Sequence, residues 1–326
     1  MFCKFTQNKS ADFSRESGFT IIELLVAITI IGILAGFAVV NLSGATASAQ
    51  LAKSKVFSST VRSSLLASAS AEWLFDDSLG AVALDNWGNP KNNCSFFGSP
   101  VWKSGIDCVD GGCLQFGASS YLNCGNGKSL DINGAITVEA WIKFSGIDYS
   151  GSTGRLWAIA AKGYPDSTAP NKGWWFTYDN RNNGKGFTYT CFGNSAGGYA
   201  GGGNNFGGYT YTFTNGDWYH LTFTVGSSRA KLYINGKQLG ATKLLSNLVL
   251  SDTSRNLFIG SYSGGPSFQG NMDTVRIYSA ALTASVISQR YVAGLDQLLA
   301  KRAITKENYQ KRLAESGQAS IIARQD

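Results

Sequence analysis

Residues 231–239, KLYINGKQL, decide the fold class of the larger part of the chain. Two short runs in which apolar and polar residues alternate flank the pair Asn235-Gly236. This pair is the one that a type I′ turn prefers, because both central residues of that turn need a positive φ. The stretch therefore predicts a β-hairpin.

The same period-2 alternation continues on both sides of the hairpin, from Glu72 onward, with clusters of glycine and asparagine between the runs. Short strands with regular turn signals are typical of an all-β sandwich. We expect a mainly β fold, a two-sheet antiparallel jelly roll. The further strands predicted are 113–116, 121–123, 137–144, 174–178, 187–192, 218–225, 257–261 and 273–278.

Composition limits the function classes that this chain can belong to. Its 326 residues are 44% hydrophobic and 15% charged, which is far from a disordered chain. The 28 Lys and Arg against 21 Asp and Glu give a net charge of +7, but no dense basic stripe is present. A nucleic-acid partner is therefore not expected.

Charged residues are absent between Glu23 and Lys53, and residues 24–40 are almost wholly apolar. With residues 19–22 the run has the length of about 20 residues that spans a bilayer. A secretory signal peptide, with small residues at 45–49 as its cleavage site, and a plain anchor are two explanations. Glu23 argues against both, because an isolated carboxylate in an apolar helix costs several kcal/mol and is by default functional.

Residues 18–26, GFTIIELLV, and their apolar continuation resemble the leader and first helix of type IV pilins and type II secretion pseudopilins. The resemblance implies that a prepilin peptidase of the inner membrane cuts after Gly18 and methylates the new N-terminal Phe19. It also implies that Glu23 pairs, in the apolar filament core, with the N-terminal ammonium of a neighbouring subunit. The implied partners are that peptidase, the inner membrane and other pilin or pseudopilin subunits.

The segment after the apolar run is rich in alanine and serine and contains no proline as far as Ala71. Ala45, Ala49, Ala52 and Val56 form a stripe at helical spacing. We expect a leader over residues 1–18 and one transmembrane and stem helix over residues 19–71. A flexible Ser/Ala linker is the alternative for the stem.

Residues 72–293 resemble the laminin G-like, concanavalin A-like lectin/glucanase superfamily. The likeness lies in segments that follow one another in the family's order: 73–76, 83–89, 114–117 with 121–123, 136–143, 218–221, 232–237, 258–260 and 272–278. This resemblance implies a two-sheet jelly roll that binds glycans or proteins and in some members hydrolyses glycans.

Catalysis by the head is not expected. Glycoside hydrolysis needs two facing carboxylates, and the only glutamates in residues 72–293 are Glu72 and Glu139, without the Glu-x-Asp-x-x-Glu pattern of the hydrolases. Glu139 shares a strand face with Trp141 and Lys143. It is therefore either a ligand contact or a solvated residue of the sheet face.

The superfamily resemblance also implies a structural calcium ion, and no other cofactor. An aspartate at the position of Asp273 is one ligand, and Asp85 is the best second candidate. The alternatives are an Asx-turn at Asp85 and a surface Asp273 that pairs with a basic neighbour.

Aromatic side chains and polar loops are the usual means of binding sugars. Trp174, Trp175 and Tyr178 lie on one predicted strand, and the alternation places at least one of the two tryptophans in the core. The glycine-rich stretch 193–208, which contains Tyr199, is either a recognition loop or a flexible insertion. These four aromatic residues are candidate ligand contacts.

The six cysteines predict disulfides in an exported head. Cys108 and Cys113 bracket a short loop and fit a local disulfide, and Cys3 falls in the leader. Cys94, Cys124 and Cys191 leave one thiol over, whichever pair forms. The tail, residues 294–326, suggests one or two amphipathic helices, laid on the sandwich or exposed as a docking arm, and a disordered end.

The sequence thus predicts a non-enzymatic pilin-like or pseudopilin-like subunit, whose laminin G-like head serves adhesion or recognition of a glycan or protein. We expect the chain to cross the membrane once, with its N-terminus in the cytoplasm before processing and its head outside the cytoplasm, at the cell surface or on a pilus after assembly. The alternative is an anchored or exported carbohydrate-binding module outside any filament. Pilus and secretion pseudopilus, and major and minor subunit, remain open.

Overall fold

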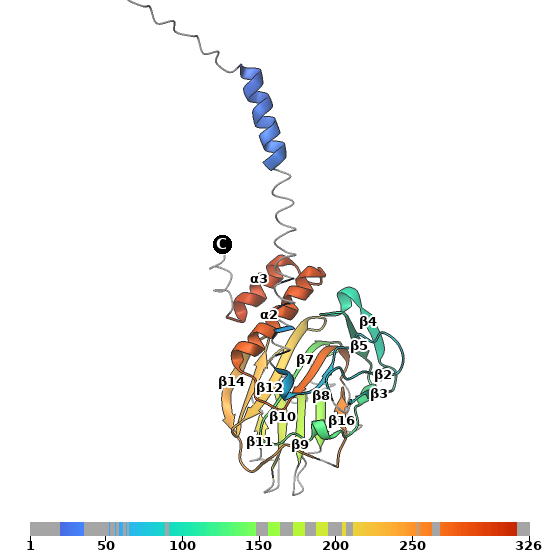
Figure 1. The fold of residues 1–326 in the computed structure, drawn as a ribbon. Coiled ribbons are helices and arrows are strands. Elements are labelled where there is room, and N and C mark those ends of the chain that lie inside the picture. Colours follow the sequence, from blue (N-terminus) through green and yellow to red (C-terminus); the bar gives the residue numbers. More distant parts are fainter. Residues whose placement is uncertain are drawn as a thin grey trace, which may run out of the picture. The chain divides into compact units, whose positions relative to one another are not determined.

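The computed structural model describes a β-rich head and one N-terminal helix (Figure 1). The described residues are 20–35, 52, 56, 59–60, 63, 65–88, 91–147, 156–163, 172–179, 187–194, 204–206, 211–252, 254–262 and 268–317; of 187–194 and 204–206 only the backbone is described.

Two antiparallel sheets form the head. Sheet 1 has the strand order β14-β13-β12-β7-β17-β5-β4, and β1 pairs with β17 beside this path. Its strands are β1 (Ala69–Trp73), β4 (Val101–Ser104), β5 (Gly112–Phe116), β7 (Ile136–Phe144), β12 (Trp218–Gly226), β13 (Arg229–Ile234), β14 (Lys237–Leu244) and β17 (Gly270–Tyr278).

Sheet 2 has the order β11-β10-β9-β8-β16-β6-β3-β2, with β15 paired to β10. Its strands are β2 (Val82–Ala83), β3 (Cys94–Phe97), β6 (Tyr121–Asn123), β8 (Leu156–Gly163), β9 (Gly173–Asp179), β10 (Phe187–Asn194), β11 (Asn204–Phe206), β15 (Leu248–Val249) and β16 (Leu257–Ile259). Single 3-10 turns lie at η1 (Leu66–Ser68), η2 (Gly105–Asp107) and η3 (Lys128–Leu130). The predicted two-sheet sandwich is confirmed.

The predicted hairpin joins β13 to β14. Asn235 and Gly236 have φ values of 52° and 76°, the positive pair that a type I′ turn requires. The side-chain oxygen of Asn235 accepts a hydrogen bond from the backbone N–H of His220 at 3.0 Å. The turn is therefore tied to the neighbouring strand β12.

Alternation along β7 separates the core from the outer face of sheet 1. Val138, Ala140, Ile142 and Phe144 point into the core between the sheets and are fully buried. Phe144 packs its ring against Trp157 of β8 at 5.6 Å between centroids. The other residues of β7 therefore point away from the core.

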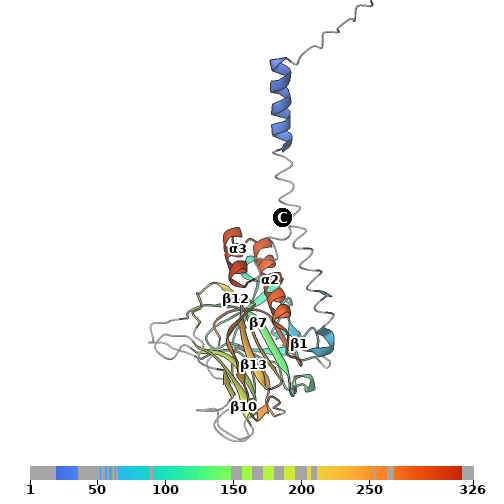
Figure 2. The ribbon, with the colours of Figure 1, turned by 90° about the vertical axis from the view of Figure 1, so that its left-hand side faces the viewer.

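Two helices of the tail cover that outer face, which confirms a tail laid on the sandwich (Figure 2). They are α2 (Ala284–Ala300) and α3 (Lys306–Glu315), whose N-caps are Thr283 and Thr305. Leu295 and Leu298 of α2 and Leu313 of α3 are among the residues buried together with Trp141 of β7. Helix α2 continues across the boundary that was predicted between residues 293 and 294. Its buried side packs on sheet 1, so the whole helix belongs to the head.

The N-terminal helix covers residues 21–35 and belongs to a separate compact unit, residues 1–50. None of the helices in the described part of the chain is both long and apolar enough to cross a membrane. Residues 36–51 of the predicted helix lie outside the described residues. Residues 52, 56, 59–60, 63 and 65 are helical.

Replacement of Gly294 on α2 by alanine should destabilise the head, although alanine is the better helix former. A Cβ atom at this position would lie 2.3 Å from Cζ2 of Trp141, so that the helix has to move off the sheet. We expect the free energy of unfolding to fall by about 1–3 kcal/mol, as measured by denaturant titration of the full chain. Gln289→Ala on the exposed side of α2 is the control; equal stability of both variants would contradict the close helix–sheet contact.

Candidate functional site

The outward residues of β7 change in character along the strand. Thr137 donates to the carbonyl of Ala280 at 2.6 Å and accepts from the N–H of Leu282 at 2.9 Å, which anchors the chain just before α2. Trp141 stacks on Tyr291 of α2 with 5.7 Å between ring centroids. Lys143, at the end of the strand, emerges from beneath the helices into a polar hollow.

Glu139, between Thr137 and Trp141, is fully buried in a network of charges. Its Oε1 accepts hydrogen bonds from Arg276 of β17 at 3.2 Å and from Tyr278 at 3.3 Å, and it pairs with Arg290 of α2 at 3.1 Å. Burial alone would raise the pKa of Glu139, but Arg290, His220 and Arg276 outweigh it and lower the pKa. Neither predicted role fits: α2 covers the residue, so it is neither a ligand contact nor a solvated side chain.

The predicted aromatic ligand contacts on β9 are also buried. Trp174 and Tyr178 belong to the core between the sheets, with exposed fractions of 1% and 0%. Trp175 points to the other face, yet it is 4% exposed and packs against Ala161 and Tyr262. The expectation of an exposed platform at these three residues is thus corrected, since β9 is covered on both faces. Tyr199 lies outside the described residues.

The predicted disulfide between Cys108 and Cys113 is present, with 5.5 Å between the Cα atoms. A second disulfide joins Cys94 to Cys124. This pairing assigns two of the three cysteines that the sequence left open. The side chain of Cys191 lies outside the described residues.

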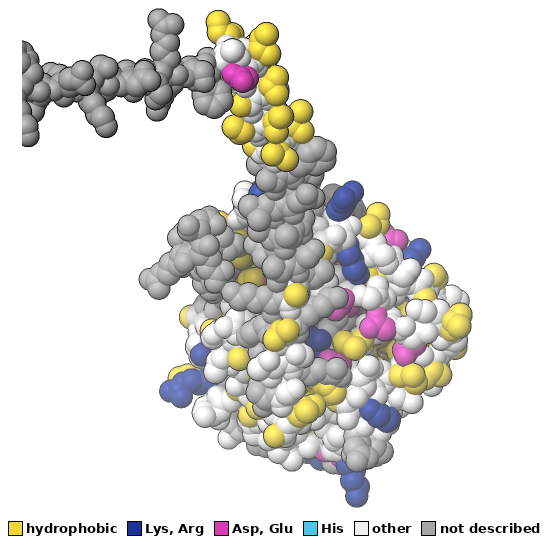
Figure 3. Space-filling view, turned by 45° about the horizontal axis from the view of Figure 1, so that its top comes forward, with side chains coloured by type: hydrophobic (Ala, Val, Ile, Leu, Met, Phe, Trp, Pro, Cys, Tyr) yellow, Lys and Arg dark blue, Asp and Glu magenta, His cyan; other side chains and the backbone are white. Residues whose placement is uncertain are grey.

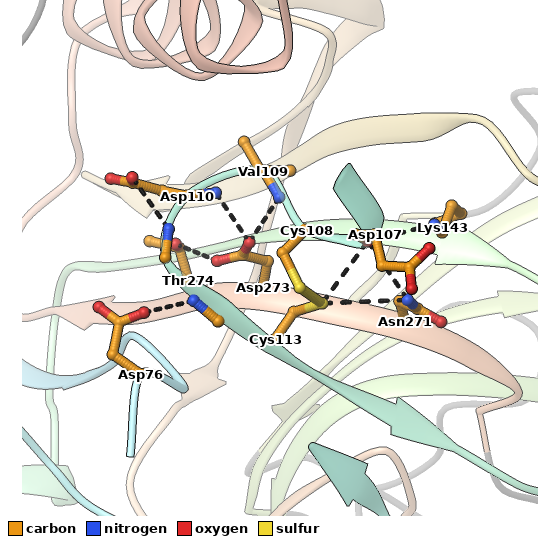
Figure 4. The surroundings of a disulfide bond; sticks show 12 residues. Asp76, Asp107, Cys108, Val109, Asp110, Cys113, Lys143, Asn271, Asp273 and Thr274 are labelled. Carbon is orange, nitrogen blue, oxygen red and sulfur yellow. Dashed lines mark hydrogen bonds between the residues drawn. A yellow bond between two sulfur atoms is a disulfide. The ribbon is translucent and has the colours of Figure 1, made fainter. Parts of the chain in front are cut away.

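Asp273 lies beside the Cys108–Cys113 loop (Figure 4). One carboxylate oxygen accepts from the backbone N–H groups of Val109 at 2.8 Å and Asp110 at 3.1 Å, and the other from the hydroxyl of Thr274 at 2.6 Å. Burial raises the pKa of Asp273 to about 7 in spite of these bonds. The disulfide sulfur atoms lie within 4.8 Å of the carboxylate, but sulfur in a disulfide is not a thiolate ligand.

Asp85 shows the Asx-turn that was the alternative to calcium binding. Its two oxygens accept five N–H groups, from the backbones of Glu72, Trp87, Gly88 and Asn92 and from the Asn92 side chain. Calcium needs six to eight oxygen ligands, whereas hydrogen-bond donors occupy the carboxylates of both Asp85 and Asp273. The described surroundings of these two residues therefore do not fit the calcium ion that the resemblance implied.

A polar cavity of about 510 Å³ opens on sheet 1 where Lys143 emerges. Strands β4, β5, β7 and β17 contribute Lys103, Gln115, Lys143 and Asn271 to its wall. The Lys143 ammonium donates to the carbonyl of Asp107 at 3.2 Å and lies 5.2 Å from the ring centre of Trp218. Burial lowers the pKa of Lys143, and Lys103 adds to this shift while Asp107 opposes it.

A second hollow of about 330 Å³ adjoins this cavity, because Gln115 and Ser145 line both. Together they form a groove whose wall carries amide, hydroxyl and ammonium groups beside apolar surface. No motif in the sequence predicted this groove. The alternation along β7 was the one feature of the sequence that pointed to it, because it places the Lys143 side chain on the outer face of sheet 1.

In the N-terminal helix, Glu23 closes a capping box with Thr20. Its carboxylate accepts from the backbone N–H of Thr20 at 2.8 Å and from the Thr20 hydroxyl at 2.9 Å, while the N–H of Glu23 donates to that hydroxyl at 3.3 Å. Gly18 and Phe19 lie outside the described residues.

Comparison with known families agrees with this division of the chain. The family model described as the concanavalin A-like lectin/glucanases superfamily matches residues 116–288, more than half of the chain. The chain belongs to this superfamily. The prokaryotic N-terminal methylation motif matches residues 13–39. The predicted fusion of a prepilin N-terminus with a concanavalin A-like head is confirmed, while no curated protein matches the chain.

Solved structures with the same fold include domain 4 of a GH43 extracellular arabinanase from Geobacillus stearothermophilus in complex with arabinotriose. It is 20% identical, with a TM-score of 0.50, over 68% of this chain and 97% of that one. The botulinum neurotoxin serotype D ligand binding domain in complex with N-acetylneuraminic acid is 15% identical, with a TM-score of 0.50, over 72% and 52%. Trypanosoma rangeli sialidase is 12% identical, with a TM-score of 0.45, over 69% and 33%.

Asp273→Asn should change how the stability of this superfamily member depends on pH. An ordinary aspartate titrates near pH 3.9, so between about pH 4 and about pH 7 the folded protein binds a proton at Asp273 that the unfolded chain releases. The stability that Asp273 contributes is therefore present at pH 4 and is lost as the pH rises through 7.

We expect the melting temperature of Asp273→Asn, relative to the unmodified chain, to rise from pH 4 to pH 7 and then to level off. The pKa of Glu139 is lowered, so its contribution to stability is lost as the pH falls rather than as it rises. This contribution is the same in the variant and in the unmodified chain, and it cancels in the comparison. Asp217→Asn, at an exposed position, is the control. A difference that stays constant with pH would contradict the protonation of Asp273 at neutral pH.

Proposed function

We propose that this chain is a pilin-type or pseudopilin-type subunit that displays a recognition head for glycans, without enzymatic activity. The observation that carries the proposal is the presence on one chain of the N-terminal methylation motif, residues 13–39, and a concanavalin A-like head, residues 116–288. A motif for processing and assembly thus precedes a fold whose members bind ligands. Adhesion is the use that this combination favours.

The proposed ligand site is the groove on sheet 1 with Lys103, Gln115, Lys143, Ser145 and Asn271. Its groups match the hydroxyl-rich surface of a sugar chain, because amides and hydroxyls both donate and accept. The arabinanase domain in complex with arabinotriose and the neurotoxin domain in complex with N-acetylneuraminic acid have the same fold. These two sugars are therefore the first ligands to test.

The burial of the head's glutamates supports a non-enzymatic head. Glu72 pairs with Arg276 at 2.7 Å, and Glu139 pairs with Arg276 and Arg290 beneath α2. A glycosidase needs its two carboxylates at the sugar, with one free to exchange a proton. Neither glutamate is open to a sugar in this arrangement.

The proposal gives the chain its partners, boundaries and location. Residues 1–18 are the leader that the prepilin peptidase removes. The transmembrane and stem helix, predicted over residues 19–71, ends before β1, so the head begins at residue 69; the apolar part of this helix inserts in the inner membrane and then in the filament. Other pilin or pseudopilin subunits contact the helix through Glu23. The head lies outside the cytoplasm, at the cell surface after assembly.

Glu23 tests the assembly role. Glu23→Ala removes both the charge and the helix cap, whereas Glu23→Gln keeps a side chain that can cap the helix and removes only the charge. If the carboxylate pairs with a neighbouring N-terminus, both variants should be cut before Phe19, yet neither should appear in sheared surface filaments. The measurements are N-terminal sequencing and immunoblots of the sheared fraction, after co-expression with a prepilin peptidase and its assembly proteins.

Assembly of Glu23→Gln at the wild-type level would show that Glu23 acts only as a helix cap. A mature N-terminus other than methylated Phe19 in the unmodified chain would overturn the pilin-type proposal itself.

Binding to the groove is tested with the detergent-solubilised full chain on immobilised arabinotriose and on glycans that carry N-acetylneuraminic acid. Lys143→Ala and Asn271→Ala should each weaken binding by about 10-fold. Lys143→Ala removes one hydrogen bond from a charged group, and Asn271→Ala removes two neutral hydrogen bonds, and either loss has about this effect on affinity. Lys237→Ala, at the far end of sheet 1, is the control and should bind as the unmodified chain does. Equal binding by all variants would place the ligand elsewhere, and no binding of either sugar by folded protein would count against this glycan class.

A further inference from the structure

Exposed apolar side chains gather at one end of the head. From residue 69 onward, seven large apolar side chains of the described residues are exposed to solvent, and six of them lie between residues 79 and 106. We name these six the β2–β4 surface: Leu79 (82% exposed), Val82 (41%), Leu84 (47%), Phe97 (43%), Val101 (48%) and Ile106 (68%). Scattered exposed residues are ordinary, but a concentration of this kind marks an interaction site.

Side-chain contacts hold the β2–β4 surface in shape. Trp102 of β4 donates from its ring N–H to the carbonyl of Gly80 at 2.9 Å and packs against Phe96 of β3 at 5.3 Å between ring centroids. The carboxylate of Asp77 accepts from the N–H of Leu84 at 3.0 Å. The edges of both sheets are thus fixed together there.

The loops of this surface are acidic. Residues 76–111, which carry this surface, contain five aspartates, Asp76, Asp77, Asp85, Asp107 and Asp110, against two lysines, Lys91 and Lys103, so that the segment has a net negative charge. Figure 3 shows hydrophobic and acidic side chains on the right-hand side of the head, with Lys or Arg side chains also on that side. A partner for this surface therefore needs both apolar and basic groups.

The opposite end of sheet 1 has that complementary character. Residues 226–250 contain Arg229, Lys231, Lys237 and Lys243 and no acidic residue. The seventh exposed apolar side chain, Leu244, belongs to the same strand as Lys237 and Lys243 and is 71% exposed. We name these five residues the β13–β14 surface; β14 and β4 are the two end strands of sheet 1.

We propose that the β2–β4 surface of one head binds the β13–β14 surface of a second copy of this chain. Like charges oppose the pairing of either surface with itself, whereas the two surfaces attract each other. A contact between two different surfaces repeats from subunit to subunit and generates open helical assemblies, as a filament requires. The proposal rests on the proposed pilin-type function, and it assigns the head its own part in subunit association.

Engineered disulfides test this contact in assembled full-length chains. Leu79→Cys and Leu244→Cys are combined in one chain in which Cys191 is replaced by serine, and the cells are treated with a mild oxidant. The double variant should give a ladder of dimers, trimers and larger species on non-reducing gels, and each single variant should stay monomeric. Leu79→Cys with Asn133→Cys, an exposed position outside both surfaces, is the control pair.

Charge supplies a second readout. Asp110→Lys or Lys237→Glu alone should reduce the ladder, and the two together should restore it. In extracted filaments the ladder should weaken between about 0.1 M and about 1 M salt, where the Debye length falls from about 10 Å to about 3 Å.

Three outcomes overturn the proposal: no ladder above the control pair, dimers from a single variant, or charge variants that leave the ladder unchanged. N-terminal sequencing of the same material keeps this result separate from the proposed function. Chains that start at methylated Phe19 and form filaments without a ladder contradict the head contact alone. Chains that are not processed contradict the pilin-type function.

Discussion

The ion pairs of Glu139 with Arg276 and Arg290 are the interaction on which the arrangement of the head depends. They join the centre of sheet 1 to α2, and through Arg276 they reach Glu72 on β1. A buried carboxylate without partners is costly, so removal of either arginine would leave a charge that the interior cannot solvate. The start and the end of the head are held to the same central strand, β7.

This constraint also determines where the head can meet a ligand. With α2 and α3 over Trp141 and the charged network, the outer face of sheet 1 opens into a cavity beyond the helices, at Lys143. The groove there is bordered by Asp107 and by Asn271, which donates to the Asp107 carbonyl at 3.4 Å. The disulfide between Cys108 and Cys113 closes the loop that follows Asp107 and thereby steadies that border.

Local patterns in the sequence predicted the strands well and the site poorly. The Asn235-Gly236 turn and the strand at residues 121–123 follow from nearest-neighbour chemistry and are present as predicted. The strand β8 was missed because it is buried on both faces and shows no alternation. Alternation placed Glu139 and Trp175 correctly on outward faces, but it carries no information on what covers those faces. Arg290, which buries Glu139, is far along the chain, and so is Asn271 of the groove.

The charged residues of the head differ in whether they are buried in contacts between distant segments or exposed at the surface. Glu72, Glu139 and Asp273 are buried, and their carboxylates pair with groups on other strands, on helix α2 and in the 108–113 loop. Among the surface charges, Asp107 and Asp110 lie in the loop between β4 and β5, and Arg229 and Lys237 lie on β13 and β14 at the other end of sheet 1, while Asp217, Glu307 and Glu315 are exposed elsewhere. The buried charges thus serve folding, while only part of the exposed charge is divided between the two ends of sheet 1. Under the proposed head contact, this partial division gives direction to the association of identical heads.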